Sequence, residues 1–300
     1  MAAAQAGKDV AVLLEGRARF DELTNLEWAL RFRNAGVRIL RLPHRKVHAK
    51  AFWVLRGCSA YLHVGTGNYH PTNGRLYTDL SLFTRDPRLT ADARAFFDAL
   101  EAGTAPVLAT MRTGSAIREL LIERIRAESH PGGCVILKCN HLTDPELLAA
   151  LDECGRSGAR VDLLVRTTLT QVTPAMHARS IVGRYLEHAR VVAFRRDGSW
   201  EVWAGSFDAM ERNFERRYEL MFPIDEPRPK RVVLKELRSQ LRDDVNTYEL
   251  RPDGSEEPRR GGSNDCQQLE AARSRAPPTS AISELDLACS ELRRSADAKR

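Results

Sequence analysis

The sequence lacks the features that would place it in a membrane or around a structural metal. No run approaches the roughly 18 consecutive apolar residues of a transmembrane helix, and the first ten residues hold no apolar stretch long enough for a secretory signal. The six cysteines are scattered, with no CxxC pair and no His/Cys cluster at the spacing of a zinc site. Scattered thiols are typical of a reducing compartment. We therefore expect a cytoplasmic protein without stable membrane insertion.

The chain does carry a mild excess of basic residues, confined to its first 250 residues. That part contains 37 Lys and Arg against 31 Asp and Glu, whereas residues 251–300 hold nine of each. A basic excess on a folded body suits a polyanionic ligand such as a nucleotide, a nucleic acid or polyphosphate. The last 50 residues are rich in Pro, Gly, Ser and charge, so we expect 251–300 to be a disordered tail.

Ahead of this tail, short apolar runs alternate with longer helix-like segments. The runs predict strands and the segments predict helices, an alternation typical of an α/β fold. A Gly-Thr-Ala-Pro stretch at 103–106 divides the body into expected domains 1–103 and 104–250. The expected strands are 10–14, 37–40, 51–55, 61–64, 135–138 and 161–165, and the expected helices are 23–34, 90–102, 115–128 and 144–154.

The most informative pattern is an internal repeat with an offset of 140 residues. His48-Ala-Lys50 recurs as His188-Ala-Arg190. Seventeen residues after each histidine comes a turn with glycine, a hydroxyl and an amide or acid, GTGN at 65–68 or GSFD at 205–208. Thirty-one residues after each histidine an acid opens an apolar strand, Asp79 or Glu219. Six positions that match by side-chain type in one register indicate a duplication.

The repeated residue types suit chemistry on phosphate. Imidazole is nucleophilic near neutral pH, and Lys50 or Arg190, two residues further on, shares the strand face and can neutralise phosphate oxygens. A carboxylate on the far ring nitrogen fixes the tautomer, which links Asp79 to the first histidine and Glu219 to the second. The turn offers its amides and hydroxyl to phosphate. Two copies would place a nucleophile and an acid/base group on opposite sides of one phosphorus.

A single histidine on a strand is more often a structural hydrogen-bonding group than a catalyst, and the repeat is what favours chemistry at His48 and His188. The remaining histidines have no such support. We expect them to be structural or exposed: His44, His63, His70, His130, His141 and His177.

The duplicated HxK and GxxN pattern resembles the phospholipase D-like superfamily, and longer strings resemble the two C-terminal domains of polyphosphate kinases. The most specific strings are KVHAK at 46–50, HVGTGNYH at 63–70, SIVGRYLEH at 180–188 and RRYE at 216–219. The resemblance runs from about residue 5 to 250. It implies two phospholipase D-like domains with mixed β-sheets flanked by helices.

The resemblance also implies an activity, the transfer of the ATP γ-phosphate to polyphosphate, in a reversible reaction. His48 matches the histidine that becomes phosphorylated, and His188 the second histidine, which contacts nucleotide phosphates and serves as acid/base partner. Asp79 and Glu219 match the carboxylates that support the histidines. The implied small-molecule partners are ATP, ADP and inorganic polyphosphate, and not nucleic acid.

Three further residues receive roles by resemblance. Tyr77 and Arg166 match ATP-contacting positions, and Arg19 matches the magnesium–phosphate site. An arginine cannot ligate Mg²⁺, so Arg19 would hold the metal-bound phosphate. Without the resemblance, we would expect Tyr77 to pack at a strand edge, Arg166 to be solvent-exposed at the end of a strand, and Arg19 to be a surface charge.

Two alternatives remain open. The family has N-terminal and head domains that this sequence does not show, so the chain could be an inactive or split fragment that binds polyphosphate or nucleotide without turnover. A homo-oligomer or a separate N-terminal half would then complete it. A phosphodiesterase of the phospholipase D type shares the histidine pair and is the second alternative.

Overall fold

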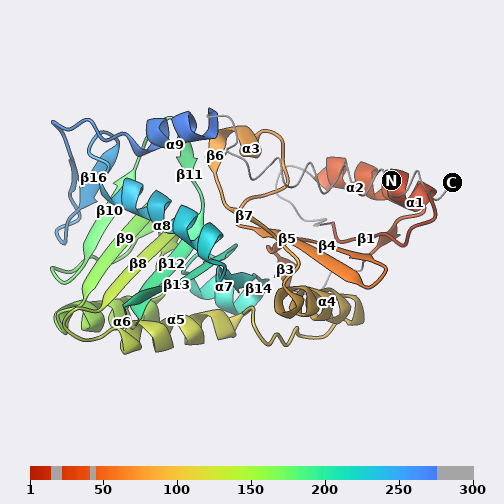
Figure 1. Ribbon diagram of the computed structural model, residues 1–300, viewed down its shortest axis with the longest axis horizontal. Helices are drawn as coiled ribbons and strands as arrows, with labels where there is room; N and C mark the ends of the chain where they lie inside the picture. Colours follow the sequence, from red (N-terminus) through yellow and green to blue (C-terminus); the bar gives the residue numbers. More distant parts are fainter. Residues whose placement is uncertain (15–21, 41–44, 197, 276–300) are drawn as a thin grey trace.

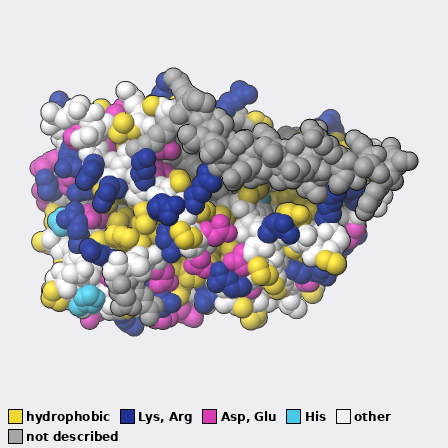
Figure 2. Space-filling model, viewed as in Figure 1, with side chains coloured by type: hydrophobic (Ala, Val, Ile, Leu, Met, Phe, Trp, Pro, Cys, Tyr) yellow, Lys and Arg dark blue, Asp and Glu magenta, His cyan; other side chains and the backbone are white. Residues whose placement is uncertain are grey.

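The computed structural model describes residues 1–14, 22–40, 45–196 and 198–275, which form two halves packed side by side (Figure 1). Within these ranges, no helix combines the length and apolar character needed to cross a bilayer. Figure 2 shows Lys and Arg side chains spread over this face of both halves and interspersed with Asp and Glu. The basic excess is thus dispersed on this face, without a single basic stripe.

The second half is built on one mixed, eight-stranded sheet. Its order is β15-β13-β12-β8-β9-β10-β16-β17; β8, β9 and β10 pair in parallel, and the other neighbours pair antiparallel. The strands are β8 (Cys134–Leu142), β9 (Arg160–Leu169), β10 (His177–Ile181), β12 (Arg190–Arg196), β13 (Ser199–Gly205), β15 (Met221–Pro223), β16 (Thr247–Leu250) and β17 (Glu256–Pro258).

Helices cover both faces of this sheet (Figure 1). Helices α5 (Ser115–Ala127) and α6 (Pro145–Arg156) pack on one face, and α8 (Pro227–Leu241) lies on the other. Helix α6 begins where the sequence allows it, since Asp144 accepts a hydrogen bond from the amide of Leu147 and a proline occupies the first turn. The sheet is therefore buried on both sides, as its continuous apolar strands require.

The first half is smaller and shares a core with the second. Its main sheet has the order β4-β5-β7, with α4 packed against it, and a two-stranded parallel sheet joins β1 to β2. Leu62, Val64 and Phe96 belong to one buried cluster with Ile136 and Leu164 of the large sheet. The elements are β1 (Ala11–Val12), α2 (Glu22–Asn34), β2 (Arg38–Ile39), β4 (Lys50–Arg56), β5 (Ser59–Gly65), β7 (Ser81–Thr84) and α4 (Pro87–Ala102).

Two short parallel strand pairs join the halves. Strand β3 (Lys46–Val47) pairs with β14 (Arg217–Tyr218), and β6 (Tyr77–Thr78) pairs with β11 (Leu186–Glu187). Each pair sets the residue before one half's histidine opposite the residue before the other half's acid: Val47 opposite Tyr218, and Glu187 opposite Thr78. The duplicated polar residues therefore meet at the boundary between the halves.

The prediction of disorder is wrong for residues 251–275, which contain a strand and a helix. Strand β17 pairs with β16, and α9 (Cys266–Arg275) contacts α8. Contacts with the preceding part of the chain hold this segment; for example, the Asp243 carboxylate accepts a hydrogen bond from the amide of Cys266 at 2.8 Å. Residues 276–300 of the predicted tail, and Arg19 and His44, lie outside the described ranges.

Candidate active site

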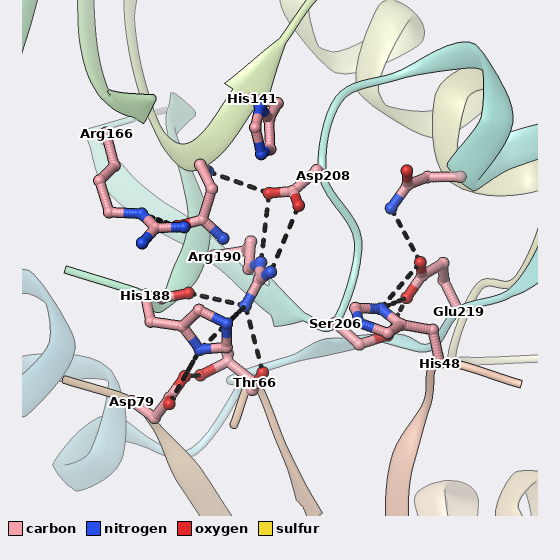
Figure 3. A network of polar contacts seen from close by, with 12 residues as sticks. His48, Thr66, Asp79, His141, Arg166, His188, Arg190, Ser206, Asp208 and Glu219 are labelled. Carbon is pink, nitrogen blue, oxygen red and sulfur yellow. Dashed lines mark hydrogen bonds and ion pairs between the residues drawn. The ribbon is translucent and has the colours of Figure 1, made fainter. Parts of the chain in front are cut away.

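The two repeated histidines are each bonded to the carboxylate of the opposite half (Figure 3). His48 Nδ1 lies 2.9 Å from Glu219 Oε2, and His188 Nδ1 lies 2.9 Å from Asp79 Oδ1. The prediction that each copy supplies the carboxylate for its own histidine is wrong. The strand pairs β3–β14 and β6–β11 cross the boundary and exchange the acids. A fixed repeat offset is compatible with both pairings, so the sequence carried no signal for the exchange.

The repeated hydroxyls hold the carboxylates. Thr66 Oγ1 donates to Asp79 Oδ1 at 2.6 Å, and Ser206 Oγ donates to Glu219 Oε2. Fully buried Glu219 also accepts from Asn213 Nδ2 at 2.9 Å. The expectation that these hydroxyls bind phosphate is therefore not met. Asn213 was not predicted as a site residue.

The two repeated cations have different surroundings. Arg190 is paired with Asp208, with Nε 3.3 Å from Oδ1 and Nη2 3.3 Å from Oδ2. The first copy has Asn68 at the position of Asp208, and the described residues form no ion pair with Lys50, whose Nζ donates to the His48 carbonyl at 2.6 Å. Burial lowers the pKa of Lys50 to about 7, with Arg190 and Arg217 acting in the same direction. Of these two cations, Lys50 is therefore the one without an ion pair among the described residues.

Both histidines are set to be neutral at pH 7. Burial lowers the pKa of His48 and of His188, and this outweighs the opposing effect of the bonded carboxylates. Because a carboxylate only accepts, each Nδ1 carries the proton and each Nε2 carries the lone pair. Arg190 Nη1 lies against the His188 ring, 3.1 Å from Nδ1 and 3.0 Å from Nε2, whereas no described residue bonds Nε2 of His48. The lone pair of His48 is the one left free to attack.

Tyr77 and Arg166, the two predicted nucleotide contacts, lie at the His188 end of the site. The Tyr77 ring lies 4.9 Å from the His188 ring, centroid to centroid. Figure 3 shows Arg166 beside Arg190 and His188, and its Nε donates to Asn140 Oδ1 at 2.9 Å. His141 bonds Thr168 at 3.1 Å, in keeping with a structural histidine.

The described residues of the site do not form a set of ligands that would hold a magnesium ion. Throughout the described ranges, no group of three or more His, Cys, Asp and Glu side chains is placed to hold a metal. The carboxylates nearest the histidines are engaged, Asp79 and Glu219 with imidazoles and Asp208 with Arg190.

Solved structures define the class of protein. A crystal structure of polyphosphate kinase from Porphyromonas gingivalis matches 91% of this chain and 45% of its own, with a TM-score of 0.80 and 28% identity. Phosphatidylserine synthase from Haemophilus influenzae matches 89% of this chain and 80% of its own, with a TM-score of 0.53 and 11% identity, a likeness of fold alone. Mixed sheets flanked by helices, with a duplicated histidine site at their boundary, make this a protein of the phospholipase D-like fold.

Sequence comparison then identifies the family. Polyphosphate kinase C-terminal domain 1 matches residues 1–106, and polyphosphate kinase C-terminal domain 2 matches residues 107–271. Polyphosphate kinase 1 of Chlorobaculum tepidum is 39% identical over 273 residues, which cover 85% of this chain and 39% of that protein. The chain belongs to the polyphosphate kinase family. It spans about two fifths of the length of the curated relatives that it matches.

Proposed function

We propose that this chain transfers the γ-phosphate of ATP to polyphosphate, reversibly, through a phosphate carried on His48. The observation that carries the proposal is the hydrogen bonding of the His48 ring. Its Nδ1 is bonded to buried Glu219, while its Nε2 has no hydrogen-bond partner among the described residues. Family membership supports the kinase over a phosphodiesterase.

In the first step, His48 Nε2 attacks the γ-phosphorus, an N–P bond forms, and the bond to the ADP oxygen breaks. The imidazole becomes positively charged, and the Glu219 carboxylate stabilises that charge through Nδ1–H. Lys50 neutralises the oxygens of the transferring phosphoryl group. In the second step, a terminal oxygen of polyphosphate attacks the same phosphorus, and neutral His48 is restored. His188 acts from the opposite side as the acid/base partner. Mg²⁺ would enter with the substrate phosphates.

Phosphate binding is expected to weaken as pH rises through about 7, because the pKa of Lys50 is lowered to about 7. The ammonium is charged below that pH and neutral above it, so affinity for inorganic tripolyphosphate should fall several-fold between about pH 6 and 8.5. Binding calorimetry across this range checks it. Lys50→Arg, which copies the residue of the second repeat, stays charged and should flatten the profile. An equally steep profile in that variant would show that another group titrates.

The proposed function is tested by incubating the chain with ATP labelled at the γ-phosphate and measuring protein-bound label. We expect label that is lost in acid and kept in base, the behaviour of a phosphoramidate, and none in His48→Ala. Addition of unlabelled polyphosphate should then remove the label from the protein. Absence of label in the wild-type chain above the His48→Ala level would refute catalysis by this chain.

A second candidate is favoured by one observation, the chain's coverage of about two fifths of its relatives' length. In that case the chain binds a phosphate chain or nucleotide without turnover, and turnover needs a separate N-terminal half. Tripolyphosphate binding together with no labelling would identify this candidate. Labelling restored by the remaining domains of a relative would identify the split form.

A further inference from the structure

Asn140 and Arg166 face each other across an irregularity between two parallel strands of the large sheet. Cys139 of β8 lies opposite Val165 of β9, but His141 lies opposite Thr168, so β9 carries one extra residue here. Bulges of this kind re-aim side chains and occur beside active sites. The result is a direct hydrogen bond, in which Arg166 Nε donates to Asn140 Oδ1 at 2.9 Å.

Asn140 leaves one of its own groups unsatisfied. Its side chain is 1% exposed, and its Nδ2 has no hydrogen-bond partner within the described part of the chain. Turning the amide over would not repair this, because a guanidinium only donates and needs the oxygen facing it. A buried amide without an acceptor is destabilising and rare. An aspartate at this position would carry no unsatisfied N–H and would attract Arg166 more strongly.

The neighbouring arginine of the site is held differently. Arg190 is paired with the Asp208 carboxylate, whereas the described residues form no ion pair with Arg166. Burial lowers the pKa of Arg166, and so does the charge of Arg190, while Asp208, Tyr77 and Asp79 act from a distance in the opposite direction. The two arginines thus differ in one respect: among the described residues Arg190 has a carboxylate in direct contact, and Arg166 has only the neutral amide of Asn140.

We propose that Asn140 is a positioning residue that fixes Arg166 through a neutral acceptor, so that Arg166 keeps its full charge for a phosphate group at the His188 end of the site. Asn140 shares a strand face with Ile136 and Lys138, and Ile136 packs in the core common to both halves. The hydrogen bond between Asn140 and Arg166 therefore lies on the face of the sheet that packs against the first half. This proposal rests on the proposed function in one respect, the identity of the ligand, which is a phosphate group of a nucleotide or of polyphosphate.

Asn140→Asp separates this role from a structural one. The aspartate keeps the acceptor for Arg166 Nε and removes the unsatisfied N–H, so the melting temperature should stay equal or rise. The new charge balances Arg166, so affinity for inorganic tripolyphosphate should fall about tenfold or more. In this variant the melting temperature should therefore stay equal or rise while the affinity for tripolyphosphate falls. Thr168→Val, a change of similar volume at the same irregularity, is the control and should leave tripolyphosphate affinity unchanged.

Two further variants complete the test. Asn140→Leu has nearly the shape of Asn and offers no acceptor; it should fold and bind tripolyphosphate several-fold more weakly, which serves if Asn140→Asp does not fold. Arg166→Gln should lose the same affinity, and adding Asn140→Asp to it should cost no more than about twofold further. Parallel titrations with a non-hydrolysable ATP analogue show whether the phosphate belongs to nucleotide, to polyphosphate or to both.

Wild-type tripolyphosphate affinity in folded Asn140→Asp or Asn140→Leu would overturn the proposal. A melting temperature and an affinity that fall together in Asn140→Asp would also overturn it, since that pattern is the signature of a purely structural residue. Because binding is measured without turnover, a chain that forms no phosphohistidine but needs Asn140 for binding would refute the proposed catalysis and leave this inference standing.

Discussion

Glu219→Gln is expected to slow phosphorylation of His48 by a factor on the order of 10³, although 171 residues separate the two positions in the chain. The amide has the shape of the carboxylate but can present an N–H to Nδ1, which would place the imidazole proton on Nε2 and remove the attacking lone pair. It also cannot balance the charge that forms on the ring. Labelling within a single turnover measures the rate.

Asp79→Asn is the matched control, because Asp79 bonds His188. It should leave labelling of His48 within about tenfold of the wild-type rate and act mainly on later transfer to polyphosphate. The reverse result, with Asp79→Asn abolishing the label and Glu219→Gln keeping it, would mean that each half serves its own histidine.

Lys138→Met is expected to lower the free energy of unfolding by about 3–5 kcal/mol. Lys138 and Glu187 are 4% and 5% exposed, and Nζ lies 2.6 Å from Oε2. Removing the lysine leaves a buried carboxylate whose remaining bonds come from neutral donors on Thr78, Gln240 and Gln267. Urea denaturation at pH 7 measures the loss.

The pH dependence of this loss follows from Glu187. Burial works to raise its pKa, but Lys138 and the hydrogen bonds hold the pKa below the usual range. The stability from the pair is therefore present above the unfolded pKa of about 4.3 and is lost as pH falls through the folded value. The gap between wild type and Lys138→Met should narrow on acidification. Lys138→Met with Glu187→Gln should recover most of the loss, and a double variant as unstable as the single one would contradict this reading.

Local sequence patterns were enough to predict the site residues that each half contributes. The repeat places His48 and His188 at equivalent positions, two residues ahead of β4 and β12, and the α/β alternation follows from apolar spacing. The partner of each histidine is decided by strand pairs between the halves, β3 with β14 and β6 with β11. Such pairing depends on packing between segments more than a hundred residues apart, and no local pattern encodes it.

The ion pairing of the two repeated cations and the order of α9 could not be predicted from the sequence either. The sequence shows Asn68 where the second copy has Asp208. Only the structure shows that Asp208 pairs with Arg190, and that Lys50 has no such carboxylate partner among the described residues. Helix α9 lies in a polar segment that composition marks as disordered. It is ordered through contacts that composition cannot show, such as the buried Gln267, whose Nε2 donates to Glu187 Oε1 at 2.8 Å.

Locating the phosphate after brief exposure of the chain to ATP shows whether His48 carries it. Peptide mass spectrometry under alkaline conditions identifies the residue, and phosphorus NMR of the phosphorylated chain distinguishes the two ring nitrogens. Because Nδ1 of His48 is bonded to Glu219, we predict that the phosphate is on Nε2 of His48. Phosphate on His188, or on Nδ1 of His48, would contradict it.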